Sequence, residues 1–238
     1  YASPLIVSAA AIAASLAPEL PESPAAPVQQ PSVTPAVPVT SALTPVIAEW
    51  DRLRQSDTLS FYDYANFMLA HPGWPGETRT RRLAEARADT PGIAPSLIVS
   101  FFTRFPPQST SAKARYANAL ADTGRAFDAK VAARTAWVAG SLAPDVEAQF
   151  LARFAGSFSQ ADQDERMERL LSAGATTAAQ RQILLVSPAR RALFDARIAL
   201  QTKRPDAATV ADALGNATLA DPGFVLDKAR WLRDTSQN

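Results

Sequence analysis

The sequence has no cysteine and only one histidine, His71. Disulfides, thiol nucleophiles and zinc sites built from cysteine and histidine are therefore excluded. A Ser-His-Asp triad would have to use His71, but the sequence places no partner beside it. Because Pro72, Gly73 and Pro75 follow this histidine, we expect it to end a helix and pack in a turn rather than act as a base.

A large excess of charge of one sign is also missing, since the formal net charge is +1. The charge balance therefore gives no reason to expect a nucleic-acid partner. The phosphate-binding patterns GxxxxGKS/T and GxGxxG do not occur, and neither does HExxH or CxxC. We accordingly expect no nucleotide, no metal and no other cofactor.

Charged residues are absent from the start of the chain until Glu19. Residues 1–17, YASPLIVSAAAIAASLA, form a short, Ala-rich apolar run that ends in small residues, which is typical of a secretory signal peptide and its cleavage site. The basic start and the initiator methionine are missing, so we interpret this run as the remainder of a truncated signal peptide. A membrane span is the alternative, but the alanines, the serines and Pro4 disfavour it.

Proline dominates the next segment, residues 18–44, which holds seven of the 19 prolines and is followed by Pro45. Glu19 and Glu22 are its only charged residues. Such a composition cannot bury a core, and it predicts a disordered linker. A Pro-rich ligand for a groove-binding partner is the alternative to a plain tether.

Residues 45–238 show apolar residues at helical spacing between Gly and Pro breaks, and no stretch alternates as a strand would. The pattern predicts an all-α domain, an irregular α-solenoid or superhelix of stacked antiparallel helix pairs. The clearest pair is ANALADTGRAFDAKVAARTAW (117–137), which is similar to a tetratricopeptide hairpin and in which Gly124 ends the first helix. No strict 34-residue period continues from it. We expect helices near residues 45–56, 60–70, 75–88, 96–105, 109–122, 125–139, 144–155, 159–172, 176–186, 188–201, 206–213 and 222–234.

Carboxylate pairs deserve a test because glycoside hydrolysis needs one carboxylic acid with a raised pKa. Glutamates of the helical part such as Glu85 and Glu168 lie among arginines, which favour the ionised form. In residues 162–169 carboxylates alternate with Arg166 and Arg169, and we interpret this stretch as a solvated helix face with local ion pairs. We therefore assign no catalytic residue.

Four tryptophans are candidates for stacking on sugar rings. Trp50, Trp137 and Trp231 occupy apolar helical positions, so we expect them in the core. Trp74 lies in a predicted turn and is expected to be the most exposed of the four. It is the only candidate substrate-binding residue.

Five segments, taken in their order along the chain, resemble the N-terminal α-superhelical region of soluble lytic transglycosylases. Glu165 stands where that family usually has a histidine, and Ser172 where it usually has an aromatic residue. The resemblance covers roughly residues 48–238. The five segments are HPGWPGE (71–77), GRAFDAKVAARTAW (124–137), DQDERMERLLSAG (162–174), ARIAL (196–200) and DKARWLRD (227–234).

The resemblance implies a helical arm that precedes a lysozyme-like domain. In that family the domain cleaves the β-1,4 bond between N-acetylmuramic acid and N-acetylglucosamine, and one Glu acts as acid and then base while a 1,6-anhydro ring closes. The Glu-Ser pair and Gly-Leu-Met-Gln run that mark it do not occur here, so this chain is expected to be inactive by itself. We interpret the chain as truncated at both ends.

Two functions follow as hypotheses. The first is the non-catalytic scaffold of a periplasmic lytic transglycosylase, whose partners are peptidoglycan glycan strands and its own downstream catalytic domain. The second is a periplasmic, tetratricopeptide-like adaptor that binds proteins and has no enzymatic activity.

Overall fold

The computed structural model describes residues 39–215 and 220–235, without the side chains of residues 39–42. These residues fold into α-helices joined by short turns, with a 3-10 turn at Ala155–Ser157 and no strand within the described ranges. The helices are α1 (Val39–Gln55), α2 (Phe61–Ala70), α3 (Glu77–Arg87), α4 (Pro95–Arg104), α5 (Thr110–Asp122), α6 (Ala126–Val138), α7 (Pro144–Phe154), α8 (Gln160–Ser172), α9 (Thr176–Gln182), α10 (Pro188–Thr202), α11 (Ala207–Asp212) and α12 (Pro222–Thr235). The predicted all-α fold is confirmed.

Two predicted boundaries need correction. Helix α1 begins at Val39 rather than at Pro45. Residues 39–44, for which the sequence predicts linker, are therefore helical, and Pro45 lies inside the helix. Helix α9 ends at Gln182, before the predicted end at 186. The predicted signal peptide 1–17 and the rest of the linker lie outside the described residues.

The helix starts follow from local chemistry. Ser60 and Ser159 each accept a hydrogen bond from the backbone N–H three residues on, and Asp63 and Asp162 bond back to the capping residues. Helices α4, α7 and α10 instead begin with a proline, whose missing N–H costs nothing in the first turn.

Three helix ends share one turn geometry. After α5 and α8, Gly124 and Gly174 adopt positive φ, and the next residue donates to a carbonyl five residues back. After α10 the same position is held by Lys203, at φ 52°. These turns reverse the chain into α6, α9 and α11.

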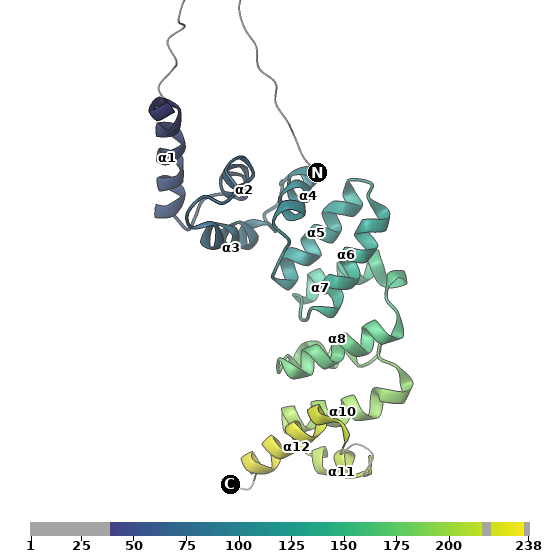
Figure 1. Cartoon of the computed structure of the whole chain (residues 1–238). Coiled ribbons are helices and arrows are strands. Elements are labelled where there is room, and N and C mark those ends of the chain that lie inside the picture. The colour runs from purple at the N-terminus through teal and green to yellow at the C-terminus, as the bar shows by residue number, and fades with distance from the viewer. Residues whose placement is uncertain (1–38, 216–219, 236–238) are drawn as a thin grey trace, which may run out of the picture.

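The helices follow one another along a curved path, with α1 and α12 at opposite ends (Figure 1). Their apolar side chains form four successive clusters rather than one core, around Phe101, Trp137, Phe194 and Phe224. Helix α5 contributes to the first two clusters and α10 to the last two. Each pair of helices therefore buries its apolar face against its neighbours, as in a solenoid.

Within the described ranges, no helix combines the length and the apolar character needed to cross a membrane.

Candidate functional site

Trp74, the candidate from the sequence, packs on its own turn. Its ring lies edge-on to Phe67 and His71, with centroid separations of 5.9 and 5.5 Å. The cavity beside it measures only about 10 Å³, which is close to the smallest space that holds one water. A sugar ring does not fit there. His71 ends α2 by donating its backbone N–H to Phe67, in the helix-ending position that the sequence predicts.

The burial of the other tryptophans differs from the prediction that all three lie in the core. Trp137 is fully buried, but Trp50 and Trp231 are half-buried, as Trp74 is. Trp74 is therefore not set apart by its exposure. Trp50 donates its indole N–H to the carbonyl of Pro75 over 2.7 Å, so α1 holds the turn that carries Trp74.

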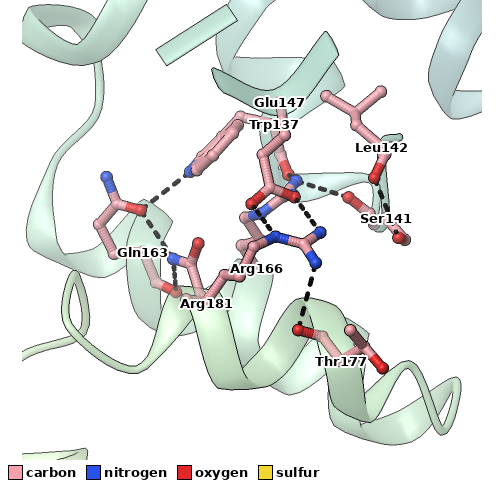
Figure 2. A network of polar contacts seen from close by, with 10 residues as sticks. Trp137, Ser141, Leu142, Glu147, Gln163, Arg166, Thr177 and Arg181 are labelled. Atoms are coloured by element: carbon pink, nitrogen blue, oxygen red, sulfur yellow. Dashed lines mark hydrogen bonds and ion pairs between the residues drawn. The ribbon is translucent and has the colours of Figure 1, made fainter. Parts of the chain in front are cut away.

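A buried polar network joins α6 and α7 to α8 and α9 (Figure 2). The guanidinium of Arg166 is fully buried and donates to the carbonyls of Trp137 and Gly140 at 2.7 and 2.5 Å. It also pairs with Glu147 at 2.9 Å and lies 3.7 Å from the ring centroid of Trp137. Burial lowers the pKa of Arg166 to about 10, so the side chain stays protonated at neutral pH.

The same network continues through amide side chains. The Trp137 indole donates to Gln163 at 2.9 Å, and Gln182 donates to the same Gln163 oxygen at 2.8 Å. Arg181 approaches Glu147 at 3.0 Å from the outer side. Because these groups come from four helices, α6, α7, α8 and α9, the network fixes how the second and third apolar clusters sit against each other.

These contacts correct the interpretation of residues 162–169 as a solvated face. Asp162 and Arg166 are buried, and the ion pairs run to other helices rather than along α8. Arg134 of α6 pairs with Asp162 at 2.5 Å. The sequence pattern missed this because residues three or four apart are only one set of partners that a charged side chain can reach.

A second buried arginine, Arg197 of α10, joins α8 to α12. It pairs with Asp227 at 2.8 Å and with Glu168 at 2.5 Å. Burial opposes its charge, but the two carboxylates outweigh that effect and raise the pKa of Arg197. Gln201 donates to the other Asp227 oxygen at 3.0 Å, so the Asp227 carboxylate is held on both sides.

Beside this cluster lies an open cleft of about 310 Å³, which we call the C-terminal cleft. It is formed where the turns at Gly174 and Lys203 meet the last helix. Its lining residues are Leu171, Gly174, Thr176, Leu200, Gln201, Lys203, Asp227, Arg230, Trp231, Arg233 and Asp234.

The C-terminal cleft combines one aromatic side chain with groups that donate hydrogen bonds. Lys203 and Arg233 pair with Asp234 at 3.4 and 3.0 Å, whereas exposed Arg230 has no ion-pair partner among the described residues. Hydrogen bonds from Arg233 and Lys203 lower the pKa of Asp234. Asp227 is bonded to Arg197 and Gln201. The donors of Lys203, Arg230 and Arg233 allow the cleft to bind polar or anionic groups.

Across the described ranges, no three His, Asp or Glu side chains gather as metal ligands. No protein-family model, no curated protein and no solved structure matches this chain. The resemblance to lytic transglycosylases therefore stays a prediction.

Proposed function

We propose that this chain is the non-catalytic helical scaffold of an exported, periplasmic lytic transglycosylase, and that it holds peptidoglycan glycan strands for a catalytic domain elsewhere in that enzyme. The proposal rests on the five resembling segments and on how four of them meet in space.

Residues of these segments hold the stack together. Arg166, from 162–174, bonds to the backbone of Trp137 and covers its ring. Arg197, from 196–200, pairs with Glu168 of the same earlier segment and with Asp227 of 227–234. These four segments thus contact one another in their order along the chain. This contact pattern is what a superhelical arm requires, and it is the observation that carries the proposal.

The C-terminal cleft supplies the binding chemistry. The half-buried ring of Trp231 offers an apolar face, and Arg230 offers unpaired donors beside it. Clefts that bind small polar ligands commonly combine an apolar wall with a few placed polar groups. Peptidoglycan carries N-acetyl groups and carboxylates, and both accept hydrogen bonds from a guanidinium.

The test is co-sedimentation of the purified chain with peptidoglycan sacculi. We expect the chain to be retained, and we expect Arg230→Ala to weaken retention about tenfold, because a hydrogen bond to a charged group contributes about 1.5–3 kcal/mol. Arg169→Ala is the matched control, since Arg169 is also exposed and unpaired within the described residues but lies on α8, outside the cleft.

The chain should release no anhydromuropeptides from the sacculi. Failure of the wild-type chain to sediment would overturn the proposal, and so would release of anhydro products. An equal loss of retention in both arginine variants would show that the cleft is not the site.

A second function, the protein-binding adaptor, is favoured by one separate observation. Phe127 and Val131 project from α6 with 79% and 55% of their surface exposed. They border an apolar groove, which has nothing in common with the C-terminal cleft. An adaptor would use this groove and would not bind sacculi.

A further inference from the structure

An apolar groove of about 410 Å³ lies along the α5–α6 hairpin. One wall is the Pro106–Pro107 loop, and the other is the exposed face of α6. We call it the hairpin groove. Its lining is mainly apolar and consists of Pro106, Pro107, Lys113, Tyr116, Leu120, Arg125, Phe127, Asp128, Val131, Ala132 and Thr135.

The loop wall of the hairpin groove is held in place by α3. Arg81 donates to the carbonyl of Pro106, and Glu85 accepts from the backbone N–H of Gln108 and Ser109 at 3.1 Å each. Because both ends of this wall are bonded, the groove exists before anything binds. A preformed groove avoids the cost of ordering a loop on binding.

The α6 wall carries exposed apolar side chains that no other described residue covers. Phe127 and Val131 are four residues apart on the outer face, while Ala129 and Ala133 fill the inner face. Burying an exposed phenylalanine side chain against an apolar partner is favourable, so a complementary ligand would be stabilised here. Lys113 stands at the same groove, and its ammonium has no ion-pair partner among the described residues.

The sequence contains a segment with matching chemistry. Residues 18–27, PELPESPAAP, place proline at every third position, and Glu19 and Glu22 are also three apart. A polyproline II helix has three residues per turn, so in that conformation the prolines share one face and the two glutamates share another. Grooves lined by aromatic side chains take such ligands through the proline face. The glutamates complement Lys113 in charge, whereas Arg125 of the same groove is already paired with Asp128 at 2.7 Å.

We propose that the hairpin groove binds the Pro-rich segment 18–27 of a second copy of this chain. The length of the linker favours the second copy. From Pro27 to Val39 the chain spans at most ~43 Å when fully extended. The first turn of α1 lies at the outer end of the molecule (Figure 1). With the 17 residues of α1 and the four helix spacings from α1 through α2, α4 and α5 to α6 taken as perpendicular steps of ~26 and ~32 Å, the groove is ~41 Å from Val39. Segment 18–27 would reach the groove of its own chain only with this linker almost fully stretched, so we assign the groove to a second copy.

The interaction has a direct test in two measurements. A labelled peptide of residues 18–27 is titrated into the chain, and the mass of the chain is followed by light scattering as its concentration rises. We expect the peptide to bind, and we expect a concentration-dependent mass increase that excess peptide reverses. Replacing Pro18, Pro21, Pro24 and Pro27 by Ala should abolish the mass increase.

Groove variants locate the contact. Phe127→Ala should weaken peptide binding at least about tenfold, because it removes an aromatic contact, and Lys113→Ala should weaken it about two- to fivefold. Leu184→Ala is the matched control, since Leu184 is 77% exposed and lies outside the groove. Phe127 is so exposed that its replacement should leave the helical circular dichroism unchanged.

Three outcomes would overturn the proposal: no peptide binding, equal weakening by Phe127→Ala and Leu184→Ala, or peptide binding by a chain that stays monomeric at every concentration. Sacculus retention of Phe127→Ala is measured alongside. The groove and the C-terminal cleft share no residue, so the two proposals can fail separately.

Discussion

Lys203 occupies a backbone conformation that suits glycine. It is the only non-glycine residue with positive φ in the described part of the chain, and it sits where Gly124 and Gly174 end the corresponding helices. A side chain in the left-handed region costs about 1–2 kcal/mol. Gly124 and Gly174 predict their turns from the sequence. Lysine does not predict a turn, so the turn at Lys203 could be found only in the structure.

Lys203→Gly should therefore raise the free energy of unfolding relative to Lys203→Ala by about 1 kcal/mol, measured by urea denaturation. Both variants remove the 3.4 Å pair with Asp234, so their difference reports the backbone alone. The reverse change, Gly124→Ala, should be destabilising although no atom lies within 4 Å of the added Cβ. Equal stabilities for the two Lys203 variants would contradict this account of the turn.

At the scale of the element, the start of α8 depends on the charge of one carboxylate. Burial of Asp162 opposes ionisation, but hydrogen bonds from Ser159 and Arg134 outweigh it and lower the pKa of this carboxyl. An aspartate with a lowered folded pKa stabilises the fold fully above its unfolded pKa of ~3.9. The stabilisation disappears as the pH falls through the folded pKa.

Asp162→Asn should accordingly cost about 1–2 kcal/mol at pH 7, and the difference from wild type should shrink below about pH 4. Urea denaturation at a series of pH values measures it. Glu165→Gln serves as the control, because it removes a charge from an exposed position of the same helix whose side chain makes no hydrogen bond or ion pair with the described residues. A cost that persists unchanged in acid would mean that shape rather than charge matters at this cap.

Proline and glycine positions in the sequence predict most of these helices, because the residue that starts or ends each helix acts locally. Pro144 and Pro188 open helices, and Gly124 closes one. The start of α1 at Val39 could not be predicted in this way, because Pro45 lies inside the helix instead of at its first turn. The contacts of Arg166 could not be predicted from local patterns either, because its hydrogen-bond partners lie 19 to 29 residues away along the chain. Local patterns give elements, whereas long-range polar contacts require the fold.

The candidate sites likewise depend on long-range packing that local sequence patterns do not predict. The sequence singles out Trp74 by its turn, but a turn says nothing about the space beside a ring, and the structure leaves about 10 Å³ there. The C-terminal cleft depends on two helix turns and α12 meeting in space. Its residues Arg230 and Trp231 stand in a segment that the resemblance quotes, yet only their placement distinguishes them from core residues.

At the scale of the whole molecule, the four apolar clusters make the stack a chain of neighbours without a shared centre. Phe61 belongs to the first cluster and Phe224 to the last, and both are 1% exposed. In a solenoid, each unit gains stability from itself and from the units it contacts. A core defect at one end should therefore act mainly at that end.

Replacing Phe61 or Phe224 by Ala provides a symmetric test, because each removes a ring from a buried site and should cost about 3–5 kcal/mol locally. Hydrogen exchange followed by mass spectrometry reports each helix separately. We expect Phe224→Ala to lower protection in α10, α11 and α12 while α2 and α4 keep theirs, and Phe61→Ala to do the opposite. The buried ion pairs around Arg166 lie between the two ends, so they set how far each defect spreads. Uniform loss of protection in either variant would mean that the stack unfolds as a single cooperative unit, and that the polar junction couples the clusters as firmly as an apolar core.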